Sequence, residues 1–124
     1  MGLKVKDIKS LTKGVKRSNK YYEDRLDTTD EWIVTRTGIE NRYITEETPS
    51  EMAKELAELL VFDKDKVRLL LIASFSSDIR IPSIAGMLHK KLDLDNSCFS
   101  LDINAACAGF VSAMIMAERM LSPG

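Results

Sequence analysis

Apolar residues recur along the chain with two different spacings, one typical of helices and one of strands. The clearest helix begins at Thr48, whose side chain can cap it while Glu51 closes a capping box and Pro49 takes the first helical position. Four apolar residues then fall on one face of this helix: Met52, Leu56, Leu59 and Leu60. This pattern predicts an amphipathic helix that packs on one side.

Two short apolar runs further along predict strands. Residues 67–75 are apolar on both faces at their centre, and residues 98–103 form a second run. A helix that opens at Pro82 and closes near Leu92 lies between them, with Ile84 and Leu88 on one face. A last helix over residues 106–121 is apolar almost all round, so we expect it to lie centrally in the core. The alternation of strands and helices predicts an α/β fold.

The first forty residues give weaker signals. Residues 3–8 alternate imperfectly between apolar and charged side chains, which predicts a weak strand. Asn19 can cap a short helix that runs through Leu26. Thr28 and Glu31 have the spacing of a second capping box, which opens a short helix that carries Trp32 and stops at Gly38.

Composition and charge narrow the class of protein. The length of 124 residues predicts one domain, and 44% hydrophobic with 30% charged residues is an ordinary globular balance. A net charge of −1 argues against a nucleic-acid binder, although residues 1–20 carry seven basic side chains and one acidic one. That basic segment is either a solvated edge or a landing zone for an anionic substrate or acidic partner.

The same inventory indicates location and metal content. No apolar run is long enough to span a bilayer, and the N-terminus lacks a signal peptide's apolar segment. Cys98 and Cys107 cannot form a disulfide framework, so we expect a reduced, cytoplasmic protein without a membrane partner. Two cysteines nine residues apart and the single histidine, His89, do not have the spacing of a zinc site, so no metal is expected.

Cys107 is the strongest candidate for chemistry. It follows the second predicted strand through a turn of small residues and lies near the start of the apolar helix. Unpaired N–H groups and the helix dipole favour a thiolate there, which is the nucleophilic form needed for acyl transfer. Ala106, Ala108 and Gly109 leave room for a substrate to approach. An inert buried thiol is the alternative that these residues leave open.

Two motifs resemble those of β-ketoacyl-acyl carrier protein synthase III. They are Asp27 to Ile39, DTTDEWIVTRTGI, and Asp102 to Phe110, DINAACAGF. The resemblance runs from about Val15 to the end of the chain. It implies the N-terminal half of a thiolase-like fold, with a mixed or parallel sheet and a central buried helix behind the nucleophile.

The resemblance also implies roles for individual residues. Cys107 would take an acetyl group from acetyl-CoA as a thioester and condense it with malonyl-acyl carrier protein. Trp32 matches the tryptophan that stacks on the CoA adenine, and Arg36 matches the arginine on the other side of the base or at the phosphates. Thr28 matches a further CoA contact. Ile81 matches a position that reaches across a homodimer to limit acyl chain length. No cofactor is implied, since CoA enters as acetyl-CoA.

Parts of the family pattern have no counterpart here. The family's catalytic histidine and asparagine lie in a C-terminal half that this chain does not match, and His89 fits an exposed helical side chain better. We therefore expect the 124 residues alone to fail in condensation. We also expect half a fold to leave apolar side chains uncovered, at about 1.5–3 kcal/mol each, so that it is not a stable monomer.

Two other functions remain open at this point. The chain could be a non-catalytic fragment that binds CoA or serves in assembly, in which case acetyl-CoA would bind without acylating Cys107. It could instead come from a related condensing enzyme that prefers another acyl-CoA as primer.

Overall fold

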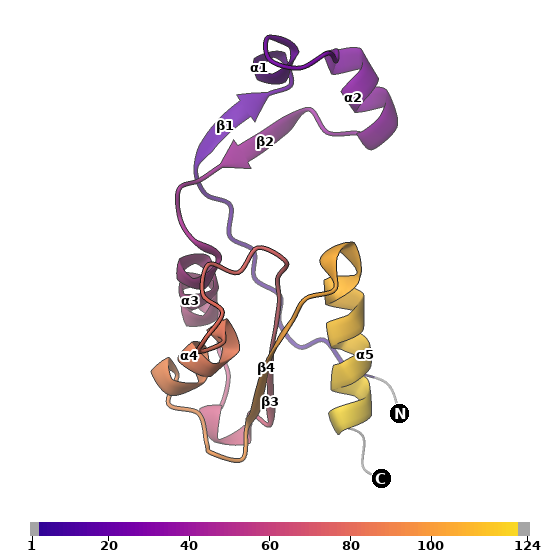
Figure 1. Ribbon diagram of the computed structural model, residues 1–124. Helices are drawn as coiled ribbons and strands as arrows, with labels where there is room; N and C mark the ends of the chain where they lie inside the picture. Colours follow the sequence, from indigo (N-terminus) through magenta and orange to yellow (C-terminus); the bar gives the residue numbers. More distant parts are fainter. Residues whose placement is uncertain (1–2, 122–124) are drawn as a thin grey trace. The chain divides into compact units, whose positions relative to one another are not determined.

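The computed structural model describes residues 3–121 and forms two compact units (Figure 1). The smaller unit is Leu11–Glu47. The larger unit combines residues 3–10 with residues 48–121. Each unit has its own two-stranded sheet. The single domain expected from the chain length stays a prediction.

The smaller unit is a β-hairpin whose connection contains two helices. Strands β1 (Val15–Ser18) and β2 (Asn41–Ile44) pair antiparallel, and α1 (Lys20–Glu23) and α2 (Asp30–Thr37) lie between them in sequence. Helix α2 starts at Thr29, whose hydroxyl accepts a hydrogen bond from the Trp32 N–H at 3.1 Å. It ends at Gly38, which has the left-handed φ of +70° that favours glycine.

Two predicted boundaries in this unit are wrong. The helix after Asn19 stops at Glu23 and not at Leu26, and the Asn19 side chain makes no capping bond because other partners hold it. Helix α2 is capped by Thr29 and not by Thr28, since Thr29 has the extended backbone that an N-cap needs. The predicted stop at Gly38 is confirmed.

The larger unit places helices on both faces of a parallel pair of strands. Strands β3 (Leu69–Ala73) and β4 (Phe99–Ile103) pair in register from Leu69 opposite Phe99 to Ala73 opposite Ile103. Helix α4 contacts the sheet on one side and α3 packs against α4, while α5 covers the other side of the sheet (Figure 1). The remaining elements are α3 (Pro49–Leu59), η1 (Lys64–Lys66), α4 (Ile84–Lys91), η2 (Ala106–Ala108) and α5 (Gly109–Leu121). The predicted α/β layering is confirmed.

The core of the larger unit lies between α4 and the sheet. Ile84, Ala85 and Leu88 of α4 are buried there together with Leu94 and Cys98. Ile84 and Leu88 are the two residues that the sequence placed on the inner face of this helix. Its cap is Ser83, one residue after Pro82, and its C-cap is Leu92.

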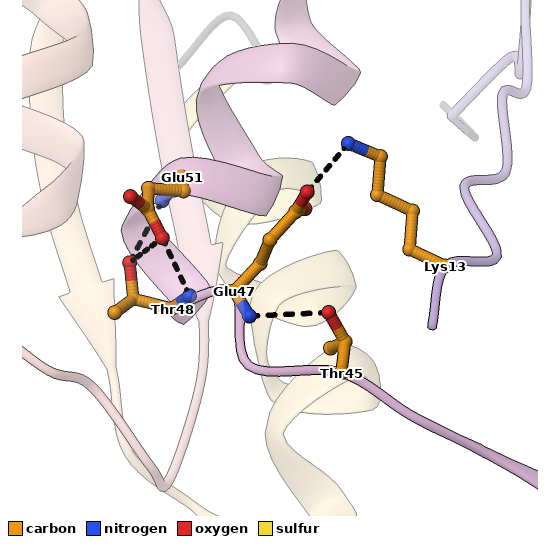
Figure 2. A network of polar contacts seen from close by, with 5 residues as sticks. All are labelled: Lys13, Thr45, Glu47, Thr48 and Glu51. Atoms are coloured by element: carbon orange, nitrogen blue, oxygen red, sulfur yellow. Dashed lines mark hydrogen bonds and ion pairs between the residues drawn. The ribbon is translucent and has the colours of Figure 1, made fainter. Parts of the chain in front are cut away.

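The N-terminus of α3 confirms the predicted capping box (Figure 2). The Thr48 hydroxyl accepts from the Glu51 N–H at 3.3 Å, and the Glu51 carboxylate accepts from the Thr48 N–H at 2.8 Å. In the other unit, Figure 2 shows Glu47 in an ion pair with Lys13 at 2.8 Å, while the Glu47 N–H donates to the Thr45 hydroxyl.

Two further expectations differ from the structure. Residues 3–8 form no strand, because they have no ladder partner among the described residues. Helix α5 is not central: among its described residues only Gly109 is fully buried, whereas Phe110 is 72% and Ile115 is 55% exposed. One face of α5 packs on the sheet, and nothing in residues 3–121 covers the other. None of the helices described over this range has the length and apolar character needed to cross a bilayer.

Candidate functional site

Cys107 lies on the turn that joins β4 to α5. The strand ends at Ile103. Cys107 is the middle residue of the short helix η2 (Ala106–Ala108), and α5 begins directly after it at Gly109. The Ser74 N–H donates to the Ile103 carbonyl at 3.0 Å, so β3 and β4 end together. The turn with Cys107 therefore begins at the edge of the sheet where both parallel strands have their carboxyl ends. Ligands commonly bind at this edge in α/β sheets.

The backbone of this turn is tight. Ala106 has a φ of +43°, in the left-handed region that side chains other than glycine rarely adopt. The Ala108 N–H donates to the Ala105 carbonyl at 2.9 Å and closes the turn. Gly109, the next residue, is buried, and a Cβ there would lie 3.4 Å from the Ala73 Cβ. The small residues that the sequence shows around Cys107 thus allow the helix to begin close to the strand ends.

The two cysteines differ in access. Cys107 is exposed, whereas Cys98 is buried beside β4. Cys107 also lines an apolar groove of about 610 Å³ between α5 and the sheet, together with Ala73, Phe75, Phe110 and Met114. A substrate can therefore reach the Cys107 sulfur but not the Cys98 sulfur.

Asp102 fixes β4 to the start of α4, a role that the sequence reasoning missed. Its carboxylate accepts from the Ile84 N–H at 2.8 Å and from the Ala85 N–H at 2.7 Å. These are two of the N–H groups that a helix leaves unpaired at its N-terminus. The available signal was a charged aspartate within a short, mostly apolar strand, since such a carboxylate needs a partner.

Trp32 stands on α2 in the smaller unit with 54% of its surface exposed. It lines two hollows, one shared with Thr28 and Arg42 and the other with Thr35 and Arg36. The Arg36 guanidinium lies 4.8 Å from the centre of the Trp32 ring, one helical turn away. The Arg36 guanidinium thus contacts the Trp32 ring directly.

Thr28 lies in the loop before α2. Its hydroxyl oxygen is buried in the hollow beside Trp32 and has no hydrogen-bond partner within the described part of the chain. Trp32 thus shares one hollow with Thr28 and the other with Arg36, and the roles of these three residues as CoA contacts stay predictions. Cys107 belongs to the other unit.

Two further candidates, Ile81 and His89, belong to the larger unit. Ile81, in the loop between β3 and α4, is 92% exposed, and its role at an acyl pocket stays a prediction. His89 is half-buried and its Nδ1 lies 2.8 Å from the Ser100 hydroxyl, so the expectation of an exposed side chain is wrong. Helix α4 packs His89 towards β4, where Ser100 offers a partner. Across residues 3–121, no three histidine, cysteine or acidic side chains are grouped as metal ligands would be.

The chain resembles curated proteins over most of its length. It is 43% identical over 113 residues to β-ketoacyl-[acyl-carrier-protein] synthase III of Acholeplasma laidlawii, covering 86% of this chain and 36% of that protein. It is 40% identical over 114 residues to the synthase III of Shigella flexneri, covering 87% and 36%. No family model matches the chain.

Solved structures agree with the sequence relatives. The crystal structure of 3-oxoacyl-[acyl-carrier-protein] synthase III from Aquifex aeolicus is 34% identical and superposes with a TM-score of 0.76 over 90% of this chain and 37% of that one. The chain thus spans about a third of the length of the proteins it matches. It is a homologue of the N-terminal part of the β-ketoacyl-acyl carrier protein synthase III enzymes, and it has the thiolase-like fold of that part.

Proposed function

We propose that this chain supplies the acyl-accepting cysteine and part of the CoA-binding surface of a β-ketoacyl-acyl carrier protein synthase III. The observation that carries the proposal is the exposed Cys107 on the tight turn beyond β3 and β4, next to an apolar groove. The identity of 43% to a synthase III supports the same assignment.

The loading step is a thioester exchange. The Cys107 sulfur attacks the acetyl carbonyl carbon of acetyl-CoA, the carbon–sulfur bond to CoA breaks, and CoA leaves as a thiolate that takes up the proton lost by Cys107. The acetyl group is then held on Cys107 as a new thioester. The small side chains around the turn leave space for the tetrahedral intermediate.

The condensation step forms the carbon–carbon bond. Malonyl-acyl carrier protein loses carbon dioxide, and the electron pair released attacks the acetyl carbonyl carbon on Cys107. The cysteine leaves as a thiolate, and the product is acetoacetyl-acyl carrier protein. Cys107 is the residue of this chain that takes part in both steps, and we expect residues 1–124 to perform the loading step.

The surface around α2 is the proposed site for the nucleotide part of CoA. The exposed Trp32 ring can stack on the adenine, and the Arg36 guanidinium can pair with a phosphate or with the base. Thr28 lines the same hollow as Trp32, which places it beside the proposed ligand. In this proposal the enzyme acts in the cytoplasm as a homodimer, and the exposed Ile81 reaches the acyl pocket of the second copy.

Release of free CoA from acetyl-CoA, measured over a range of concentrations, tests the proposal. We expect one CoA released per chain, and we expect Trp32→Ala to require roughly tenfold more acetyl-CoA for half-maximal release, because an aromatic–base stack is lost. Tyr43→Ala is the matched control, since Tyr43 is also an exposed aromatic residue but lies on β2 outside the hollows.

The same assay identifies the preferred acyl-CoA primer, and it distinguishes an enzyme that loads acyl groups from a fragment that only binds CoA. Faster release from a longer or branched acyl-CoA would identify a related condensing enzyme with another primer. Saturable binding of CoA without any release would contradict loading and leave a CoA-binding fragment.

A further inference from the structure

The side chain of Asn19 is fully buried at the end of β1, with 0% of its surface exposed. Among residues 3–121 it is the only polar residue buried to this degree. A buried amide has to satisfy both its donors and its acceptor, because an unpaired polar group inside a protein is costly. The partners of Asn19 therefore show what this residue holds in place.

Those partners lie at the two ends of α2. The Asn19 Nδ2 donates to the Asp30 carboxylate at 2.8 Å and to the Ile39 carbonyl at 2.7 Å. Asp30 is the first residue of α2, and Ile39 directly follows its C-cap, Gly38. One amide group thus binds at both the N-terminal and the C-terminal end of the helix that contains Trp32 and Arg36.

A third bond ties this amide to the hairpin. The Asn19 Oδ1 accepts from Arg42 of β2 at 2.9 Å, and the Arg42 guanidinium lies 4.9 Å from the centre of the Tyr22 ring. The Asn19 backbone N–H also donates to the Glu40 carbonyl. Arg42 and Tyr22 line the hollow that Trp32 and Thr28 share. Asn19 therefore connects α2 with Arg42, another residue that lines this hollow.

We propose that Asn19 is a positioning residue for the CoA-binding surface, holding α2 so that Trp32, Arg36 and Thr28 face the same ligand. The inference rests on the proposed function for its ligand, but the bonds to Asp30, Ile39 and Arg42 define the positioning itself. Helix α2 has its own cap at Thr29 and a bond from the Asp30 N–H to Glu23 at 2.6 Å. Loss of Asn19 therefore leaves a helix that forms but is no longer held at its orientation.

A double-mutant cycle with Asp30 tests this inference. Asn19→Asp removes both donors and places one carboxylate against another, whereas Asp30→Asn keeps a neutral amide oxygen that can still accept from the Asn19 Nδ2. In the double variant, the new amide at position 30 can donate to the new carboxylate at position 19, while the Ile39 carbonyl stays without its donor. Asn96→Ala is the control, because Asn96 is exposed and lies in the larger unit.

Trp32 is the only tryptophan of the chain, so its fluorescence reports on α2 directly. The measurements are the emission and acrylamide quenching of Trp32, the CoA concentration for half-maximal quenching, and the acetyl loading rate of Cys107 at saturating acetyl-CoA. We expect Asn19→Asp to raise the half-maximal CoA concentration about tenfold and to alter the Trp32 emission, and Asp30→Asn to have a smaller effect. The loading rate at saturation should stay unchanged, and the double variant should recover part of the CoA affinity that Asn19→Asp loses.

The outcomes separate the inference from the function on which it rests. Unchanged Trp32 emission and CoA affinity in both single variants would overturn the positioning role, as would a double variant that recovers nothing. If CoA does not affect wild-type Trp32 while the cycle still shows loss and recovery of its emission, the positioning of α2 stands and the CoA site is wrong. Asp30→Ala, which removes the acceptor of the Asn19 Nδ2, should also alter the Trp32 emission, and it keeps the test decisive if Asn19→Asp does not fold.

Discussion

Gly14 shows how strongly a single position depends on the absence of a side chain. Its φ is +97°, and a Cβ there would lie 2.1 Å from the Ile44 carbonyl oxygen on the paired strand. Gly14→Ala should therefore lower the free energy of unfolding by about 3 kcal/mol or more. Gly38→Ala is the matched control, since Gly38 also has a positive φ but no atom within 4 Å, and we expect a loss of about 1 kcal/mol.

Thermal unfolding followed by Trp32 fluorescence measures both glycine variants. Equal losses at the two positions would contradict the close approach of Gly14 to β2.

The candidate site residues could be predicted from the sequence where the residue type and its immediate neighbours indicated a role. Cys107 stands out by its place after an apolar strand, and Trp32 and Arg36 by the motif around them. Partners distant in sequence gave no such signal. Asn19 was interpreted as a helix cap, which is its usual role before a helix, but its amide is held by residues up to 23 positions away. Local patterns cannot show such bonds.

Asp102 is expected to determine the stability of α4. Its carboxylate accepts from two backbone N–H groups at the start of this helix, where negative charge is also favoured by the helix dipole. Asp102→Ala should lower the free energy of unfolding by about 2 kcal/mol, and Asp102→Asn by less. Urea unfolding measures the difference. A loss no larger than that of Asp95→Ala, whose carboxylate binds only Ser97 in an exposed loop, would contradict this role.

The start of α3 should be sensitive to acid. Hydrogen bonds from the Thr48 N–H and hydroxyl lower the pKa of Glu51 below its ordinary 4.5, and the Ser50 hydroxyl and N–H lower the pKa of Asp78 below 3.8. Because both pKa values are depressed in the folded state, the stabilisation is complete above these ordinary values and is lost as the pH falls through the lowered ones.

Ser50→Ala and Thr48→Ala should therefore make the stability less dependent on pH below about 4.5. Urea midpoints measured between neutral and acidic pH test this. Parallel pH profiles for the variants and the wild type would show that these carboxylates are not the cause.

Elements were predictable where all the parts of a signal are close in sequence. The capping box at Thr48 and the inner face of α4 are of this kind. The start of α2 was misplaced by one residue because Thr28 and Thr29 can both cap a helix, and only the tertiary structure selects Thr29. The strand expected at residues 3–8 is absent because a strand needs a neighbour, which an alternating pattern does not supply.

Exposed apolar surface is the main feature of the larger unit as a whole. Phe110, Val111 and Ile115 of α5 are all more exposed than buried. Covering each would contribute about 1.5–3 kcal/mol. We therefore expect the chain to associate in solution, and sedimentation at several concentrations tests this. A monomer at every concentration would contradict the expectation.

The most direct test of the account is to locate the acetyl group after incubation with acetyl-CoA. Peptide mass mapping distinguishes Cys107 from Cys98, and the buried Cys98 serves as the internal reference. We predict one acetyl group per chain, carried on Cys107 and absent from Cys107→Ser. Acetylation of Cys98 to the same extent, or no acetyl group on either cysteine, would contradict the claim that the turn after β4 presents an acyl-accepting thiol.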